Sequence, residues 1–388
     1  MVLDLTEALS GPYCGAILSD LGAQVIKIER PEGDIMRKRG SGGATDGIPF
    51  QMIHRNKKSL AVDIRDKRGA DLVRRLSRKA NVLVENFRPG VLDRRGLGFE
   101  ELSQENPALV YCSISGFGQT GPLREVGAVD LVAQGHSGLM SVTGTAAGQI
   151  AKAGFPVSDL SAGMWAAMSV TAALLRAARS GRGTHLDIAL VDSIVAWALW
   201  ELADYQISGQ VPGPLGTAHR LVAPYQAFPC KDGRWITLAA VDRKWPKFCE
   251  LIGTPSLPDD ERFETEYARF QNREKLAQII SERLKSASAD AWILRLRTNG
   301  IPCGIVNDIG DLLDDPQLAE RKVIVDLDLG GEAVNVLQTP VIADGVPGVM
   351  QRAPRLGEHS LELSRAAGLS DIEVKDLVDR GVLRLAAE

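Results

Sequence analysis

Asp159 is the residue of this chain with the clearest potential for chemistry. It follows residues 137–157, which are rich in Gly, Ser, Thr and Ala and predict a mobile surface loop, and it precedes residues 160–179, which predict a long helix. A carboxylate at the start of a helix meets unpaired backbone N–H groups, so we expect its pKa to be lowered and the group to stay ionised. Two interpretations remain open: an ordinary N-cap aspartate, or a carboxylate nucleophile for acyl transfer.

The elements that must position Asp159 form a repeated strand–helix pattern. Residues 2–5 and 23–28 predict strands on either side of a helix that begins at Gly11 and Pro12. Because such crossovers are right-handed and join parallel strands, we expect an α/β fold with a Rossmann-like parallel sheet. The pattern recurs in predicted helices at 69–79 and 99–104, strands at 82–84, 109–112 and 186–190, and a helix at 192–205.

The pattern changes at residues 207–222, which are rich in Gly and Pro and predict a linker. Beyond it, predicted strands at 225–229 and 235–239 flank Lys231-Asp232-Gly233, a hairpin signal. Helices predicted at 245–251, 272–284 and 289–298 complete a smaller α+β domain.

Composition excludes several classes of protein. Of 388 residues, 45% are apolar and 24% are charged, as in a soluble globular protein. The formal charge of −4, without a basic block, gives no reason to expect nucleic-acid binding. Because no signal peptide and no run of about 20 uninterrupted apolar residues is present, we expect a cytoplasmic protein without a membrane segment.

The cysteines and glycines indicate neither a metal site nor a nucleotide site. Five scattered cysteines lack C-x-x-C spacing and predict free thiols, without a disulfide framework or zinc site. The first predicted strand–helix turn lacks G-x-G-x-x-G, and no G-x-x-x-x-G-K-[ST] loop occurs. We therefore expect no metal and no NAD or ATP site.

Six runs, taken together and in order, resemble the class III coenzyme A transferases, the CaiB/BaiF family that includes formyl-CoA and carnitine-CoA transferases. The resemblance covers nearly the whole chain and implies that Asp159 is the covalent aspartate and that Asp130 is an acidic residue near the active site, although Asp130 could equally be a solvated loop acid. The runs lie at residues 9–12, 22–31, 56–60, 84–90, 154–163 and 353–359.

The resemblance implies an exchange of coenzyme A between two carboxylates without ATP or any other cofactor. Asp159 would attack the thioester of a short acyl-CoA, of which succinyl-CoA is the first to test, and a carboxylic acid would accept the coenzyme. A protein that binds coenzyme A needs cations and backbone donors for its phosphates, at one end of the sheet. The family's coenzyme A contacts fall on Ala8, Ser10, Arg30, Val62, Arg65, Asn86, Phe87 and Arg94.

Three alternatives remain open. A 2-methylacyl-CoA racemase of the same superfamily would carry His directly before Asp130, where this chain has Val129, and His136 lies six residues further on. An NAD-dependent oxidoreductase is disfavoured by the missing glycine fingerprint. A non-catalytic coenzyme A-binding protein would keep Arg30 and Arg94 but would not need Asp159.

The resemblance also implies an interlocked homodimer, in which each subunit forms a ring threaded by its partner. In place of a tetraglycine lid found in some members, the linker has His219 and Arg220, which could meet a second carboxylate of the substrate or be structural. The expected organisation is a large domain at 1–206, a linker at 207–222, a small domain at 223–320, a second linker at 321–340, and residues 341–388 returning to the large domain.

Overall fold

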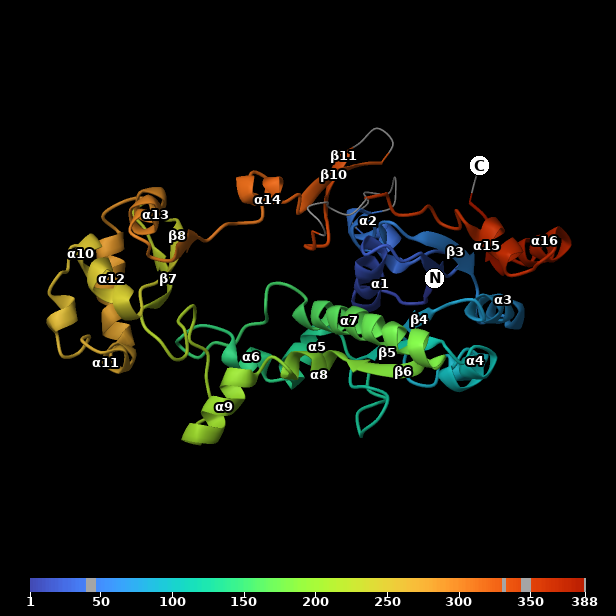
Figure 1. Cartoon of the computed structure of the whole chain (residues 1–388), viewed down its shortest axis with the longest axis horizontal. Coiled ribbons are helices and arrows are strands. Elements are labelled where there is room, and N and C mark those ends of the chain that lie inside the picture. Colours follow the sequence, from blue (N-terminus) through green and yellow to red (C-terminus); the bar gives the residue numbers. More distant parts are fainter. Residues whose placement is uncertain (40–46, 330–332, 343–349, 387–388) are drawn as a thin grey trace. The chain divides into compact units, whose positions relative to one another are not determined.

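The computed structural model describes residues 1–39, 47–329, 333–342 and 350–386, and these fall into two compact units. The first unit comprises Met1–Leu139, Lys152–Ser208 and Pro316–Glu388, and the second comprises Met140–Ala151 and Gly209–Asp315. Figure 1 shows the elements of both units in chain order. All residues predicted for the site belong to the first unit.

A seven-stranded sheet forms the centre of the first unit and confirms the expected α/β fold. Six parallel strands lie in the order β3-β2-β1-β4-β5-β6, and β12 (Leu383–Arg384) pairs antiparallel with β3, so that both ends of the chain contribute strands. In this order the direction of winding reverses between β1 and β4, and ligands of such sheets bind beyond the carboxyl ends of the strands at that point. The parallel strands are β1 (Val2–Asp4), β2 (Val25–Glu29), β3 (Lys58–Val62), β4 (Val82–Glu85), β5 (Val110–Ser115) and β6 (Thr184–Ala189).

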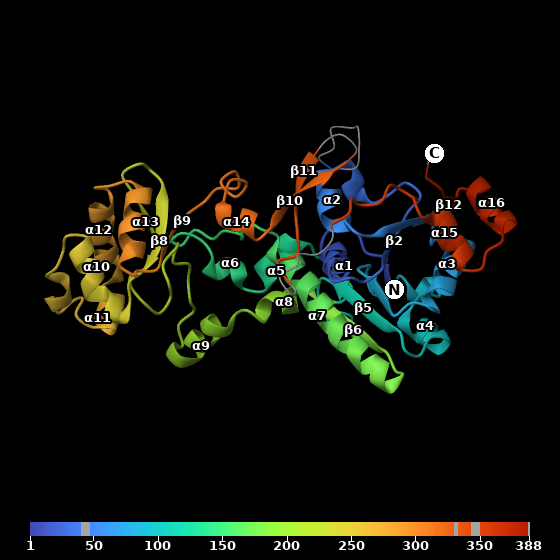
Figure 2. The same cartoon turned by 45° about the horizontal axis from the view of Figure 1, so that its top comes forward.

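Helices cover both faces of the sheet because successive strand side chains point to opposite sides. Leu3 and Leu83 pack with α3 (Lys67–Ser77) and α4 (Phe99–Glu105), together with α15 (Ser360–Ala366) and α16 (Asp371–Asp379). On the other face, β-strand valines pack against α1 (Ser10–Asp20) and α7 (Val157–Ser180), and Figure 2 shows α7 running along β5 and β6.

Small residues allow α1 and α7 to pack closely. A Cβ on Gly163 would lie 2.6 Å from the backbone oxygen of Ser10, so this position of α7 accepts no larger residue without a shift. Helix α7 is long and apolar enough to cross a membrane by length and composition alone, a criterion that core helices of soluble proteins also meet.

The structure corrects several expected elements. Helix α7 begins at Val157, three residues before its expected start. The helix expected at 192–205 is broken into α8 (Leu190–Val195) and α9 (Leu199–Ser208). The loop expected at 137–157 contains the short helix α6 (Leu139–Val142), and α2 (Ile48–His54) and α5 (Asp130–His136) were not predicted.

The second unit has its own apolar core, which includes Phe228, Ile236, Phe248 and Trp292. The predicted hairpin is confirmed, since β7 (Tyr225–Pro229) pairs antiparallel with β8 (Trp235–Ala239), and β9 (Cys303–Ile305) adds a third strand. The helices are α10 (Trp245–Leu251), α11 (Glu266–Gln271), α12 (Arg273–Leu284) and α13 (Ala289–Thr298). In the first unit, α14 (Pro316–Glu320) precedes a hairpin of β10 (Ile324–Asp328) and β11 (Ala333–Leu337), within residues 321–340.

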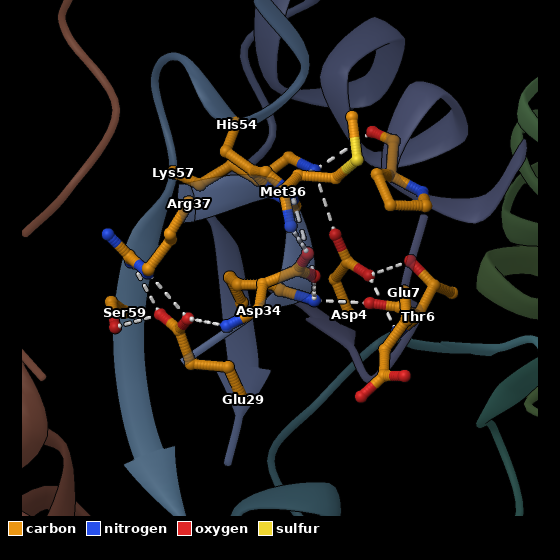
Figure 3. Close-up of polar contacts among 12 residues, drawn as sticks. Asp4, Thr6, Glu7, Glu29, Asp34, Met36, Arg37, His54, Lys57 and Ser59 are labelled. Carbon is orange, nitrogen blue, oxygen red and sulfur yellow. Dashed lines mark hydrogen bonds and ion pairs between the residues drawn. The ribbon is translucent and has the colours of Figure 1, made fainter. Parts of the chain in front are cut away.

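A buried network of charges lies at the carboxyl ends of β1 and β2 (Figure 3). Lys57 Nζ donates to Asp4 Oδ2 at 2.8 Å, and Lys27 Nζ lies 2.9 Å from Asp34 Oδ2; all four side chains are fully buried. Lys27 also donates to the backbone oxygen of Thr6, in the loop that leaves β1. Because isolated charges are costly to bury, this pairing fixes the loops that follow both strands.

A second part of the same network ties the returning C-terminal segment to the sheet. Arg37 forms an ion pair with Glu29 at 2.6 Å and donates to the backbone oxygen of Pro354 at 3.1 Å. Ser59 donates to Glu29 Oε1 at 2.6 Å and accepts the N–H of Gly357 at 2.9 Å. The segment after residue 350 is therefore held by polar groups of β2 and β3.

His54 contacts this network without adding charge to it. Its ring is fully buried, with Nδ1 3.3 Å from Lys57 Nζ. Burial, followed by the positive charges of Lys57, Lys27 and Arg37, holds the pKa of His54 well below its usual value. The imidazole is therefore neutral beside the three cations.

We predict that Arg37→Met lowers the free energy of unfolding by about 3–5 kcal/mol, because it leaves the Glu29 carboxylate buried without its partner. The matched control is Arg365→Met, which breaks an exposed ion pair with Asp371 and should cost less than about 1 kcal/mol. Urea titration followed by circular dichroism measures both. Equal losses in the two variants would contradict the role given to the buried pair.

Candidate active site

Asp159 occupies the first turn of α7 but is not its N-cap. Pro156 is the N-cap residue, so Asp159 is the third residue of the helix, and the expectation of an N-cap aspartate was wrong. Its side chain is partly buried and receives no hydrogen bond from the part of the chain that the structure describes. The carboxylate is therefore not used to satisfy the helix terminus.

Asp130 satisfies this helix terminus instead. It is the first residue of α5, and its Oδ1 accepts the backbone N–H of Ser158 at 3.0 Å and the Ser158 hydroxyl at 2.7 Å. Its Oδ2 accepts from Gln134 Nε2 at 2.7 Å, and Gln134 Oε1 in turn accepts the N–H of Ala153 at 2.8 Å. These hydrogen bonds hold the Asp130 carboxyl in a fixed position beside the first turn of α7.

The two carboxylates thus have different surroundings, and this reverses the expected pKa shift of Asp159. Burial, and then the negative charge of Asp130, raises the pKa of Asp159 to about 6. We expected the helix terminus to lower it. The terminus does not prevail, because a neighbouring N–H of that turn already donates to Asp130 and no donor among the described residues reaches the Asp159 carboxylate.

Four of the eight residues expected to contact coenzyme A line one cavity of about 240 Å³ at the carboxyl ends of β1, β2 and β3: Arg30, Val62, Arg65 and Phe87. Arg65 also lines a second cavity of about 410 Å³, together with Arg94. Ser10 is buried at the start of α1, and Ala8 is exposed with a φ of 66°. This positive φ is unusual for a residue other than glycine and marks a special conformation of the loop.

Asn86 connects the loops that follow β1 and β4, where the winding of the sheet reverses. Its Oδ1 accepts the N–H of Glu7 at 2.9 Å, and its Nδ2 donates to the backbone oxygen of Glu7 at 2.8 Å. Asn86 and Phe87 also line a cavity of about 380 Å³ with Ala128 and Val129, which directly precede Asp130. This cavity therefore extends from two of the predicted coenzyme A residues to the residues directly before Asp130.

The three arginines differ in their partners. Arg30 pairs with Glu7 at 2.7 Å, and both side chains are partly exposed. Arg65 pairs with Asp63 at 2.8 Å. The backbone N–H of Arg94 donates to Gly90, but its guanidinium has no hydrogen-bond or ion-pair partner among the described residues, so it is available to an anion without displacing a carboxylate.

Several residues of this region were missed by sequence reasoning. Gln134 follows Asp130 by four residues on α5, a spacing that places two side chains on one helix face and could have been noticed. Glu7 and Arg95 also line the cavity that contains Arg30. Ser158 gave no signal, because its partner Asp130 lies 28 residues away in sequence.

The histidines do not approach the acidic pair through any described contact. His136 lies at the other end of α5 from Asp130 and its ring packs on Phe117 at 5.1 Å. In the second unit, the His219 ring stacks on Tyr225 at 4.8 Å, and Arg220 donates to the backbone oxygen of Gly213 at 2.9 Å. Among the described residues, no group of three His, Cys, Asp or Glu side chains has metal-ligand geometry.

Comparison with known proteins identifies the family. Residues 1–360 match the family described as CoA-transferase family III. The chain is 39% identical to a succinate–glutarate CoA-transferase of Agrobacterium fabrum over 93% of both chains, and 33% identical to a succinyl-CoA:glutarate CoA-transferase of Homo sapiens over 98% of this chain and 88% of the human one. A solved CaiB/BaiF family protein from Brucella suis has a TM-score of 0.84 at 36% identity, covering 94% of this chain and 97% of that one.

We predict that Asp159→Asn stabilises the protein at neutral pH. A carboxyl whose pKa is raised on folding costs more and more stability as the pH rises from its usual value of 3.8 to about 6, and the cost is constant above that; asparagine carries no such charge. The gain should reach roughly 1–2 kcal/mol above pH 7 and shrink toward pH 4. Thermal unfolding at several pH values measures it; a variant less stable than the wild-type protein at pH 7.5 would contradict the assignment.

Proposed function

We propose that this chain, which belongs to CoA-transferase family III, moves coenzyme A from a short acyl-CoA to a small carboxylic acid through a covalent intermediate on Asp159. The observation that carries the proposal is the Asp159 carboxylate, which receives no hydrogen bond from any described residue, beside Asp130, whose two carboxyl oxygens both accept hydrogen bonds. Such a group is free to attack. Succinyl-CoA is the first donor to test, and glutarate the first acceptor, because the relatives described above are named for them.

The reaction divides into two exchanges at Asp159. An Asp159 oxygen attacks the thioester carbonyl, and the coenzyme A thiolate leaves with the electron pair of the C–S bond, which gives a mixed acyl anhydride. The thiolate then attacks the aspartyl carbonyl and expels the first carboxylate, so that Asp159 carries coenzyme A as a thioester. The acceptor carboxylate repeats both steps in reverse order, and Asp159 returns as the free carboxylate.

The environment of Asp159 supports both halves of this cycle. Its raised pKa makes the carboxylate more basic than that of an ordinary aspartate, which favours attack on the thioester. Asp130 accepts hydrogen bonds from the backbone N–H and the hydroxyl of Ser158, which ties α5 to the first turn of α7 that carries the nucleophile. One thioester is exchanged for another, so no ATP, metal or redox cofactor is required.

The lining of the cavities beyond the carboxyl ends of the strands supports a coenzyme A site there. Arg94 and Arg65 would meet phosphate oxygens, Arg30 would do so after release from Glu7, and Phe87 offers an aromatic face to the adenine. The charge of these arginines matches a ligand with a diphosphate and a 3′-phosphate. We further propose that the protein acts in the cytoplasm, where acyl-CoA and organic acids are available.

A homodimer is supported by apolar side chains that the first unit leaves uncovered. Helix α9 has no buried residue, and Leu199, Trp200 and Ile207 are 71%, 67% and 88% exposed. Side chains of this kind on a ten-residue helix require a partner surface. We propose that a second copy of the chain covers them in the interlocked arrangement expected from the family resemblance, with the large domain assembled from residues 1–206 and 341–388.

The central experiment compares wild-type protein with Asp159→Ala and Asp159→Asn. Both variants should fold, whereas succinyl-CoA:glutarate exchange should fall by several orders of magnitude, because neither side chain can form the anhydride. Wild-type protein quenched after mixing with succinyl-CoA should carry an adduct on the peptide that contains Asp159, and hydroxylamine should convert it to a hydroxamate.

Two results would contradict this mechanism. An Asp159→Asn variant with near wild-type exchange would show that the carboxylate is not the nucleophile. Rapid deuterium uptake from D2O at the α-carbon of a chiral 2-methylacyl-CoA, with racemisation and no exchange, would favour the racemase instead.

We predict that Arg94→Met weakens coenzyme A binding by about 1.5–3 kcal/mol, the contribution of a hydrogen bond between charged groups. Arg365→Met, on the exposed surface of α15, is the control and should leave binding unchanged. Isothermal titration calorimetry with coenzyme A and with dephospho-CoA, which lacks the 3′-phosphate, shows whether Arg94 contacts the 3′-phosphate or the diphosphate. An Arg94→Met variant that binds both ligands as tightly as the wild-type protein would remove Arg94 from the site.

We predict that the protein sediments as a dimer even at nanomolar concentration, because interlocked rings cannot separate without unfolding. Fluorescence-detected sedimentation measures this, and mixing two differently labelled preparations tests for exchange. A folded monomer in rapid equilibrium with the dimer would contradict the interlocked arrangement.

A further inference from the structure

Glu85 is a buried acid that the transfer reaction does not use. It ends β4, next to the point where the winding of the sheet reverses, and only 6% of its surface is exposed. Buried carboxylates are costly unless they are bonded and placed for a purpose. Among the described residues, Glu85 interacts with neither Asp130 nor Asp159. Any effect of Glu85 on the site must therefore act through the segment that follows it.

The hydrogen bonds of Glu85 lead directly to the proposed coenzyme A site. Its Oε2 accepts the backbone N–H of Phe87 at 2.8 Å, which closes a tight turn around Asn86. Asn86 is bonded to both backbone groups of Glu7, and Glu7 pairs with Arg30. The hydrogen bond from Phe87 to Glu85 therefore fixes the backbone conformation at Asn86 and Phe87, and Asn86 in turn fixes the position of the loop that carries Glu7.

On its other side Glu85 faces a cavity of about 250 Å³, distinct from those lined by the arginines Arg30 and Arg94. This cavity offers water and protons a route to the carboxyl group without unfolding of the sheet. Several neighbouring elements contribute titratable or charged groups to its lining. These are Arg88 from the following loop, Asp93 from the 3₁₀ helix Asp93–Arg95, Glu100 from α4, Tyr111 from β5 and His185 from β6. Gly90, Phe99, Ser113 and Gln119 complete this part of the lining.

Burial, more than the neighbouring charges, determines the pKa of Glu85. Burial raises its pKa to about 7, hydrogen bonds from Ser113 and from the N–H of Phe87 oppose the rise, and the charges of Asp93 and Asp187 add to it. Ser113 Oγ lies 2.9 Å from His185 Nε2, so a short polar chain runs from β4 to β6. Burial lowers the pKa of His185, which therefore adds no positive charge near Glu85 at neutral pH.

We propose that Glu85 is a positioning residue for coenzyme A: its ionised carboxylate holds the Asn86–Phe87 segment in the conformation that binds the coenzyme, and its protonation loosens that segment. This rests on the proposed function of the site. An ionised acceptor binds the Phe87 N–H more strongly than a neutral one. Affinity for coenzyme A therefore rises as the pH rises through the titration of Glu85, while the rate of the chemical steps at Asp159 does not follow it.

The test measures the dissociation constant of dephospho-CoA by calorimetry from about pH 6 to about pH 8.5. Dephospho-CoA is chosen because a phosphate monoester such as the 3′-phosphate of coenzyme A itself titrates near pH 6. Wild-type protein should bind about fivefold more tightly at the high end, the difference expected between a charged and a neutral acceptor. Glu85→Gln, whose amide oxygen still accepts the Phe87 N–H, should bind at the weaker level at every pH.

A second variant shifts the titration without removing it. Ser113→Ala deletes a hydrogen bond to the ionised carboxylate, so the pKa of Glu85 rises and the inflection of the binding curve should move to higher pH. The maximal rate of succinyl-CoA:glutarate exchange should stay within about twofold of wild type in both variants, because neither side chain is part of the acidic pair.

The proposal would be overturned if the dissociation constant of dephospho-CoA had the same pH dependence in wild type, Glu85→Gln and Ser113→Ala. It would also be overturned if the variants lowered only the maximal rate of exchange and left this dissociation constant unchanged. Failure of the wild-type protein to bind coenzyme A at any pH is a different result, because it would overturn the proposed function on which this inference rests. If Glu85→Gln does not fold, the direction of the Ser113→Ala shift decides alone.

Discussion

The candidate site depends on the hydrogen bonds that Asp130 accepts from Ser158 in the first turn of α7. A helix start normally recruits a nearby side chain to bind its unpaired N–H groups, and Asp159 is well placed to do so. Asp130 takes this role from another helix, and no donor in the described part of the chain contacts the Asp159 carboxylate. One carboxylate is consequently structural and bonded, and the other is available and more basic, which is how paired carboxylates acquire different roles.

The buried charge network also supports the candidate site, because it fixes the loops that follow β1 and β2. Lys27 reaches the backbone oxygen of Thr6, directly before Glu7, and Arg37 reaches the returning chain at Pro354. The runs 22–31 and 56–60, which alone resemble ordinary strands with charges, supply Lys27 and Lys57 to this network. Lys27 pairs with Asp34 and Lys57 with Asp4, so the positions of the coenzyme A loops are fixed by buried ion pairs as well as by apolar packing.

Sequence alone predicted much of the architecture, because apolar runs and glycine turns are local signals. Strands 225–229 and 235–239 and helix 289–298 agree with β7, β8 and α13 residue for residue. Strand β3 and helix α5 were missed, since Lys57, Lys58 and Asp130 interrupt the apolar pattern for reasons that become clear only in three dimensions. The pKa of Asp159 could not be predicted because it depends on burial and on Asp130, 29 positions earlier in the sequence.

The most direct test is the pKa of Asp159 itself, measured by ¹³C NMR of the labelled side-chain carboxyl in wild-type protein and in Asp130→Asn. The structure predicts titration near pH 6 in the wild type and a lower value in the variant, since asparagine still accepts the Ser158 N–H but carries no charge. Titration of Asp159 at its ordinary aspartate value in both proteins would contradict the account, because the nucleophile would then owe nothing to its buried and negatively charged surroundings.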